Sequence, residues 1–309
     1  MAGSLHFRAN GKLMLFGEYA VLNGCTAIAW PTRFGQNLQV HSEKLLVNGL
    51  YWKSIDHKGE VWFEAYFDEE FNLLHELQNE VALTLQKILL KARSLNPEFL
   101  KDGNYHSAEI EADYPREWGL GSSSTLIYLI AKWAEVDPMK LFFSTLSGSG
   151  YDVACAGSET PIAYQKTGLH QATWKALNWD LSVLDSACFV YLGTKQSSRE
   201  GILYYVNKGL DKQEMAESLN ALVEDYLLYP SREKLLESMD DSEELLSQSL
   251  MMDKVKDLYF SDFPGSVKSL GAWGGDFVMA LANDPEFDAK SYFIQKGYEI
   301  VLAPKEMLL

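Results

Sequence analysis

The hydrophobic pattern of the chain changes from short β-prone runs to longer helical stretches. Apolar residues that alternate with polar ones predict strands near the N-terminus at 5–9, 13–16, 27–30 and 36–40, with a hairpin region over 44–67. The dipeptides Asn10-Gly11 and Asn23-Gly24 are strong turn formers and are expected to separate these strands. Apolar residues at helical spacing predict a helix over 71–94.

The remainder of the chain continues this mixture. Strands are predicted at 106–112, 161–174, 187–192, 277–281 and 299–303, and helices at 126–134, 137–146 and 291–297. Residues 197–260 are predicted to be mostly helical, with a restart at Pro230-Ser231 and a break at 262–265. Strands and helices do not alternate regularly and no repeat is evident, so the pattern indicates an α+β fold.

A chain of 309 residues is long enough for a large core and is expected to divide into two domains. Because the pattern becomes mostly helical after about residue 180, we predict an N-terminal domain over 1–180 and a C-terminal domain over 181–309. No apolar stretch is long enough to span a bilayer, and residues 1–8 do not resemble a signal peptide. We therefore expect no membrane association.

Charge and cysteine content narrow the class of partner. The formal net charge is −16, which argues against nucleic acid as the main partner. The three widely spaced cysteines form no Cys-x-x-Cys motif and indicate reduced thiols in a cytoplasmic protein. The histidines show no spacing typical of zinc ligands. An anionic small molecule would need local basic residues, for which Lys12, Arg116, Lys195, Arg199 and Lys268 are candidates, although solvated surface charge is the commoner role of any one of them.

The stretch from Pro115 to Thr125 carries the strongest chemical signal. A β-prone run precedes it, an apolar helical run follows it, and between them stand Gly119, Leu120 and Gly121 with Ser122, Ser123 and Ser124. Glycines let the backbone approach a ligand closely, and the N–H groups at a helix N-terminus attract phosphate. The alternative is an ordinary helix N-cap preceded by a glycine turn. Taken by itself, the stretch does not decide between these two interpretations.

Two further glycine-rich stretches and a few charged residues extend this signal. Gly148-Ser149-Gly150 precedes a single carboxylate, Asp152, and the third glycine-rich turn covers 271–276. Lys12 and Glu18 flank an apolar run, so they are either strand-edge residues or members of a site. The chain lacks the Walker A motif, the protein-kinase signatures and the third glycine of the dinucleotide-binding fingerprint.

Taken in order, these motifs resemble those of the GHMP small-molecule kinases. Residues 11–21 resemble the first family motif, Pro115 to Thr125 the second, which is the phosphate-binding loop, and 268–276 the third. Gly17-Glu18-Tyr19 is more similar to phosphomevalonate kinases than to mevalonate kinases, which usually have His after the Glu. Three features depart from the family pattern: Asn10 stands in place of a proline, Trp273 in place of a glycine, and no carboxylate lies near Lys140 to act as a second metal ligand.

The resemblance implies a two-domain fold and a set of roles. It implies an N-terminal domain like domain 2 of ribosomal protein S5, a C-terminal ferredoxin-like α/β sandwich, and use of ATP with Mg²⁺. The expected nucleotide-binding residues are Pro115, Gly119, Leu120, Gly121, Ser122, Ser123 and Ser124, and Ser123 is also the expected metal ligand. Asp152 and Lys12 are the expected catalytic pair, although Asp152 could instead be a helix N-terminal acid and Lys12 a hairpin-edge charge.

The acceptor side is less sharply defined by the resemblance. The expected substrate contacts are Glu18, Tyr19, Ser197, Ser198, Arg199, Gly274 and Gly275. For Glu18, a structural role in which the carboxylate binds backbone N–H groups and stabilises loops is equally expected. The expected acceptor is a small anionic molecule of the mevalonate pathway, with phosphomevalonate first. Mevalonate kinase, diphosphomevalonate decarboxylase and a non-catalytic nucleotide-binding homologue remain open. The protein is expected to be a monomer or a homodimer.

Overall fold

The computed structural model describes residues 3–74, 79–193, 198–209, 211–271 and 276–309. Two compact units can be distinguished, and they interleave along the chain. The first unit consists of Met1–Gly11, Phe34–Arg116 and Leu120–Gly157, and the second of Lys12–Arg33, Glu117–Gly119 and Ser158–Leu309. A boundary between folding domains near residue 180 stays a prediction.

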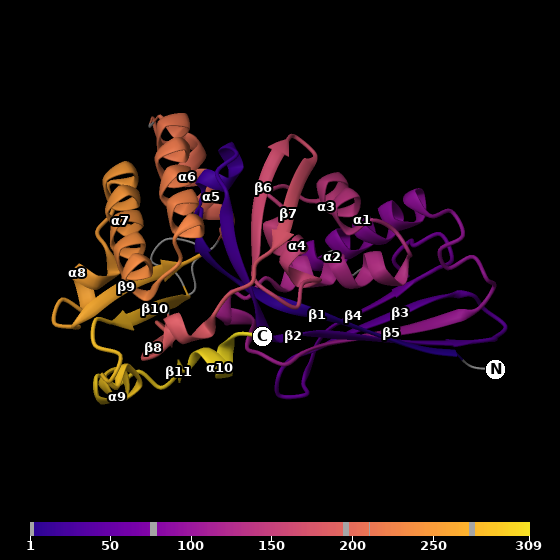
Figure 1. Cartoon of the computed structure of the whole chain (residues 1–309). Coiled ribbons are helices and arrows are strands. Elements are labelled where there is room, and N and C mark those ends of the chain that lie inside the picture. The colour runs from indigo at the N-terminus through magenta and orange to yellow at the C-terminus, as the bar shows by residue number, and fades with distance from the viewer. Residues whose placement is uncertain (1–2, 75–78, 194–197, 210, 272–275) are drawn as a thin grey trace. The chain divides into compact units, whose positions relative to one another are not determined.

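The first unit is a sheet covered by helices. Its sheet contains β3 (Gly49–Ile55), β4 (Val61–Phe67), β5 (Tyr105–Ala112) and the second half of β2 (Ala27–Glu43). β3 pairs antiparallel with β4 and parallel with β5, and β5 pairs antiparallel with residues 36–43 of β2. The helices of this unit, α1 (Glu80–Leu95), α2 (Ser122–Trp133), α3 (Pro138–Thr145) and α4 (Tyr151–Ala156), lie over one face of the sheet (Figure 1).

Alternation along the strands builds the core of this unit. Leu50 and Trp52 of β3 and Ala108 and Ile110 of β5 are buried in one cluster with the apolar face of α1. The predicted start of that helix at residue 71 is wrong. Helix α1 begins after Asn79, whose side chain accepts a hydrogen bond from the Ala82 N–H, and this N-cap fixes the first turn.

Strands β1 (Gly3–Phe16) and β2 are each longer than the sequence pattern predicts. The turn predicted at Asn10-Gly11 is wrong, because β1 runs through this dipeptide. β1 pairs with β2, and a Cβ placed on Gly35 of β2 would lie 2.2 Å from the carbonyl oxygen of Ala9. The close pairing of two long strands thus overrides the local turn preference of Asn-Gly.

The second unit contains a four-stranded antiparallel sheet in the order β11-β8-β10-β9. Its strands are β8 (Ala187–Tyr191), β9 (Gly265–Leu270), β10 (Phe277–Ala282) and β11 (Val301–Leu302). In the same unit, residues 27–29 of β2 pair with β6 (Ile162–Gly168), which forms a hairpin with β7 (Gln171–Ala176).

Helices cover both faces of the four-stranded sheet (Figure 1). The helices of this unit are α5 (Ser198–Asn207), α6 (Lys212–Leu228), α7 (Arg232–Leu250), α8 (Val255–Tyr259), α9 (Ala289–Gln295) and α10 (Pro304–Met307). On one face, Phe293 of α9 packs in a cluster with Val190 and Val278. On the other, the Ser266 hydroxyl of β9 donates to the Leu236 carbonyl of α7.

The predicted α+β fold class is confirmed. The helix restart is confirmed as well, since Ser231 caps the N-terminus of α7 by accepting from the Lys234 N–H. Short 3₁₀ turns occur at Ala20–Asn23, Arg116–Trp118 and Leu181–Leu184. Within the described ranges, no helix has the length and apolar character needed to cross a membrane.

Candidate active site

The N-terminus of α2, in the first unit, is built from the glycine- and serine-rich stretch. Gly121 occupies the N-cap position with φ 90°, in the left-handed region that favours glycine. The N–H groups of Ser124 and Thr125 donate to the Gly121 carbonyl, and no described side chain caps this end of the helix. The N–H groups of Ser122 and Ser123, which precede these two donors, and the positive end of the helix dipole are thus available to an anion.

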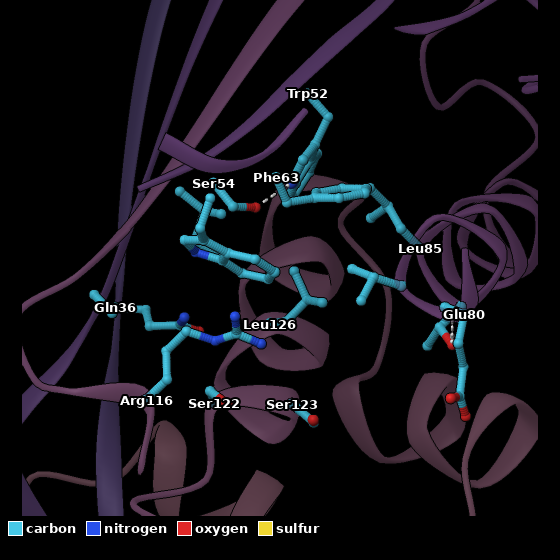
Figure 2. A pocket seen from close by; sticks show the side chains of 15 residues that line it. Gln36, Trp52, Ser54, Phe63, Glu80, Leu85, Arg116, Ser122, Ser123 and Leu126 are labelled. Carbon is cyan, nitrogen blue, oxygen red and sulfur yellow. Dashed lines mark hydrogen bonds between the residues drawn. The ribbon is translucent and has the colours of Figure 1, made fainter. Parts of the chain in front are cut away.

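A cavity of about 280 Å³ opens at this helix end, and every residue that lines it belongs to the first unit. Figure 2 shows Ser122, Ser123 and Arg116 along one side and Trp52 and Phe63 on the opposite side. The Arg116 guanidinium lies 3.5 Å from the centroid of the Trp62 ring, a cation–π contact. Aromatic walls beside a polar helix N-terminus suit a ligand with a flat ring and an anionic tail.

Hydrogen bonds order the polar rim of this cavity. The Trp52 indole Nε1 donates to the Ser54 hydroxyl at 3.0 Å, as Figure 2 shows. The Thr125 hydroxyl, from the first turn of α2, contacts Gln36 Oε1 at 2.5 Å. The first contact joins two side chains of the cavity wall, and the second ties Gln36 of the wall to α2, so these parts of the wall are held in place before any ligand arrives.

In the second unit, Lys12 lies beside the first glycine of the same stretch. Its Nζ donates to the Gly119 carbonyl oxygen at 3.0 Å, and the side chain is only 7% exposed. Gly119 has φ +66°, and a Cβ placed on it would lie 1.7 Å from Asp276 Oδ2. Lys12, Gly119 and Asp276 line one small cavity together with Trp118 and Phe277. A larger residue at position 119 would therefore need a strained backbone conformation and a shift of the Asp276 carboxylate.

Asp152 belongs to the first unit and lies in the first turn of the short helix α4, after Gly150 with φ 87°. This is the position that the sequence allowed for a helix N-terminal acid, and it leaves the side chain half-buried. Its pairing with Lys12, like its catalytic role, stays a prediction.

Glu18 and Lys268 form a buried ion pair in the second unit. Lys268 Nζ lies 2.7 Å from Glu18 Oε1 and 3.3 Å from Glu243 Oε1, and none of the three side chains is more than 3% exposed. The Ser269 N–H also donates to Glu243 Oε1, at 3.2 Å. The placement of Lys268 differs from the alternative of solvated surface charge, because two carboxylates from distant parts of the chain compensate its burial.

Burial and mutual contact shift the pKa values of this triad. Burial raises the pKa of Glu243 to about 7, although the Lys268 ammonium opposes the shift. Burial also raises the pKa of Glu18 against the same ammonium. Burial alone would lower the pKa of Lys268, but the two carboxylates outweigh it and raise that pKa. The triad thus combines one cation with two carboxyl groups that protonate more readily than in water.

Next to Glu18, Tyr19 has an uncommon backbone conformation, with φ 56° and ψ −43°. The Ala20 N–H donates to the Glu18 carbonyl at 2.5 Å, so Tyr19 is the central residue of a γ-turn of the rarer, strained hand. The Tyr19 ring stacks on Tyr205 of α5, with centroids 5.5 Å apart. Its hydroxyl lies 2.7 Å from where a Cβ on Gly201 would be. Tyr19 is therefore packed closely against α5.

Several expected acceptor contacts cannot be placed. Ser197, Gly274, Gly275 and the neighbouring Trp273 lie outside the described residues. Ser198 and Arg199 lie in the first turn of α5, and their side chains are also outside the description. Their roles stay predictions.

The described residues offer a magnesium ion one expected protein ligand, the Ser123 hydroxyl. Ser123 presents an exposed hydroxyl at the N-terminal turn of α2. Among the residues whose positions are described, no three His, Cys, Asp or Glu side chains gather as a metal site. Mg²⁺ needs few protein ligands when a nucleotide supplies phosphate oxygens, so a single hydroxyl is compatible with it.

Four residues with prominent contacts in the structure have no predicted role in the site. Trp62 was assigned only to a hairpin, Glu243 to an amphipathic helix, and Tyr205 and Asp276 received no role of their own. The glycine before Asp276 in the chain was the sole local signal for it. For Glu243, burial depends on a lysine in another element, which local pattern does not reveal.

No family model and no curated protein matches the sequence significantly. Solved structures do match it. The Methanococcus jannaschii mevalonate kinase aligns with a TM-score of 0.71 and 15% identity over 97% of both chains. Streptococcus pneumoniae phosphomevalonate kinase in complex with phosphomevalonate and AMPPNP gives 0.71 and 18% over 96% of this chain and 99% of that one.

The Staphylococcus aureus mevalonate diphosphate decarboxylase gives a TM-score of 0.64 and 13% identity over 98% of this chain and 96% of that chain. At such identities these likenesses establish the fold. The chain thus has the two-domain fold of the GHMP kinases, as the motif resemblance implied.

Proposed function

We propose that this protein is an ATP-dependent kinase of the GHMP type that transfers a phosphoryl group to an acceptor of the mevalonate pathway, with phosphomevalonate as the preferred acceptor. The observation that carries the proposal is the N-terminus of α2, which no described side chain caps and which opens into an aromatic cavity at Ser122 and Ser123. The phosphomevalonate kinase complex with AMPPNP, which shares the fold, supports both the nucleotide and the acceptor.

In this proposal the cavity of the first unit holds the nucleotide. Its base lies against the aromatic wall near Trp62 and Arg116, and the phosphates lie at the first turn of α2. The N–H groups of Gly121, Ser122 and Ser123 bind phosphate oxygens, and Pro115, Gly119, Leu120 and Ser124 shape the loop. Ser123 also holds Mg²⁺, which when bound neutralises charge on the phosphates.

Phosphoryl transfer requires mainly positioning and stabilisation of charge. The Lys12 ammonium, fixed by the Gly119 carbonyl, neutralises negative charge on the transferring group. Asp152 orients the attacking oxygen of the acceptor and accepts its proton where one is present. A phosphorylated acceptor is already ionised, so it demands little of Asp152 as a base.

The acceptor side consists of Glu18, Tyr19, Ser197, Ser198, Arg199, Gly274 and Gly275 in this proposal. The position of Tyr19 against α5 supports its part, since α5 begins within the expected acceptor segment. Glu18 contributes through its buried pair with Lys268. A cytoplasmic protein that is a monomer or a homodimer remains the expectation.

A second candidate is the decarboxylase of diphosphomevalonate, because an enzyme of that activity shares the fold over nearly the whole chain. The kinase and the decarboxylase reactions both release ADP, but only the decarboxylase reaction releases CO₂. An assay of ADP release with mevalonate, phosphomevalonate, diphosphomevalonate, homoserine and galactose, run with CO₂ detection, separates the candidates.

The matched variant for this assay is Asp152→Asn, which keeps the size of the side chain. We expect ADP release with phosphomevalonate and a loss of at least about 10²-fold in the variant. Full activity of Asp152→Asn would contradict the role of Asp152. ATP binding without turnover of any acceptor by the folded protein would contradict the kinase assignment.

A further inference from the structure

The strained turn at Tyr19 needs a source of stability outside itself. A non-glycine residue with φ 56° and ψ −43° is unfavourable and persists only when surrounding contacts hold it. One contact is the stacking of Tyr19 on Tyr205, whose ring is 1% exposed and whose hydroxyl donates to Asn23 Oδ1 at 2.8 Å. This contact fixes the ring from the side of α5.

The second anchor is the side chain of the preceding residue. Glu18 is 2% exposed, and its carboxylate finds a cationic partner in the Lys268 ammonium at 2.7 Å. Among the described residues, neither Glu18 carboxylate oxygen has a well-aligned hydrogen-bond partner. Since an unpaired buried carboxylate is costly, Glu18 is held where Lys268 is.

Lys268 is itself held from two sides. It belongs to β9, and Glu243 of α7 contacts it at 3.3 Å while accepting from the Ser269 N–H. Its Nζ also lies 5.6 Å from the centroid of Phe16, at the end of β1. Because a strand of the sheet and a helix fix Lys268, it is a rigid attachment point for the 17–19 segment.

We infer that Lys268 is a positioning residue that fixes the strained turn at Tyr19 and thereby the acceptor side of the site. Lys268 has no exposed surface and does not touch the acceptor; it acts through Glu18. The inference rests on the proposed function for its kinetic consequence, but its structural consequence can be measured without any substrate. In this inference Glu243 has a supporting role, because its carboxylate holds the side chain of Lys268, a residue of β9, in place.

The test compares wild type with Lys268→Met and with the triple variant Glu18→Gln/Lys268→Met/Glu243→Gln. Loss of the lysine alone leaves two buried carboxyl groups, and this variant could fail to fold. The triple variant keeps the buried volume without charge, a type of change that buried ion triads often tolerate. Lys254→Met is the matched control, because it removes an amine paired with Glu244 at a partly exposed position in the same unit.

The structural readout is amide hydrogen exchange in peptides covering 17–24 and 198–207. We expect exchange to rise about tenfold or more in both peptides of the triple variant, and to stay unchanged over 121–133 and in the control. Unchanged exchange over 17–24 in a folded variant would overturn the inference. This readout holds even if no acceptor is turned over, so it separates the inference from the proposed function.

The kinetic readout is the KM for phosphomevalonate against the KM for ATP. We expect the acceptor KM to rise about tenfold in the triple variant, with the ATP KM and kcat within about threefold of wild type. A parallel rise of both KM values would show a general structural role and would overturn the inference. Wild-type protein inactive with every acceptor, but with the expected exchange pattern, would instead contradict the proposed function alone.

Discussion

The ammonium of Lys12 lies 3.0 Å from the carbonyl oxygen of Gly119, at the beginning of the glycine- and serine-rich stretch. This contact places a nearly buried cation beside the backbone that leads into α2. In the proposed kinase, it is the fixed positive charge for the transferring phosphoryl group.

Lys12→Met removes this charge and keeps the length of the apolar stem. We expect kcat to fall about 10²–10³-fold, because the side chain acts on charge that develops during transfer. ADP release measures the effect, and circular dichroism checks the fold. Lys132→Met, on an exposed position of α2, should retain wild-type kcat. Equal losses in the two variants would argue against a specific role of Lys12.

Arg116 and Trp62 should contribute to nucleotide affinity. Arg116→Ala removes the guanidinium 3.5 Å from the Trp62 centroid and should weaken AMPPNP binding about threefold. Trp62→Ala removes a cavity wall and should weaken it about tenfold or more. Arg116→Lys keeps the charge but loses the planar stack, so it should resemble Arg116→Ala. Calorimetric titration gives these affinities, and unchanged values in all three variants would place the nucleotide elsewhere.

Gly119→Ala should damage the loop for two reasons. The residue has φ +66°, and its new Cβ would lie 1.7 Å from Asp276 Oδ2. Gly59→Ala is a matched control, since Gly59 has φ +81° and open space around its Cβ position. The control should lose about 1–2 kcal/mol of unfolding free energy, and Gly119→Ala clearly more. Urea unfolding measures both, and equal losses would mean that Asp276 moves aside freely.

The buried triad should make stability depend on pH. The pKa of Glu243 is about 7 in the folded protein, against 4.5 for the ordinary group. Between these values the native state holds a proton that the unfolded chain has lost, so the free energy of unfolding falls as pH rises. The contribution lost over this window is about 3 kcal/mol.

Glu243→Gln should reduce this fall, because the amide does not ionise, whereas Glu18 keeps a pKa that burial raises. Urea unfolding at several pH values between 4.5 and 7 measures the slope for wild type and variant. Glu244→Gln is the neighbouring control: the Lys254 amine lowers the pKa of this exposed carboxyl, so its replacement should leave the fall in place. A wild-type slope that Glu243→Gln does not change would contradict the burial of an ionisable triad.

The order of elements could be predicted from the sequence, whereas their limits depend on tertiary pairing. The helices over 197–260 and the restart at Ser231 follow from local periodicity and capping chemistry. The turn predicted at Asn10-Gly11 is wrong because β1 continues through this dipeptide and pairs with β2. Local sequence rules do not predict such pairing between distant segments. The start of α1 was predicted too early because Phe71 and Leu74 continue the apolar spacing, although neither of them is helical.

The candidate site likewise contains residues whose proximity the sequence predicts and residues whose proximity it does not. The residues that are expected to bind phosphate are contiguous, so the sequence could place them together at a helix N-terminus. The triad draws on Glu18, Glu243 and Lys268, and the aromatic contact joins Trp62 of β4 to Arg116. Such groups come together only through the fold, and a single sequence gives no signal for their proximity.

The most direct test of the kinase assignment is ³¹P NMR of the wild-type protein incubated with ATP, Mg²⁺ and phosphomevalonate. The proposal predicts that ADP appears together with a new diphosphate ester in equal amount, and that Asp152→Asn forms both much more slowly. Inorganic phosphate without the ester, or unchanged ATP in the presence of folded protein, would contradict it.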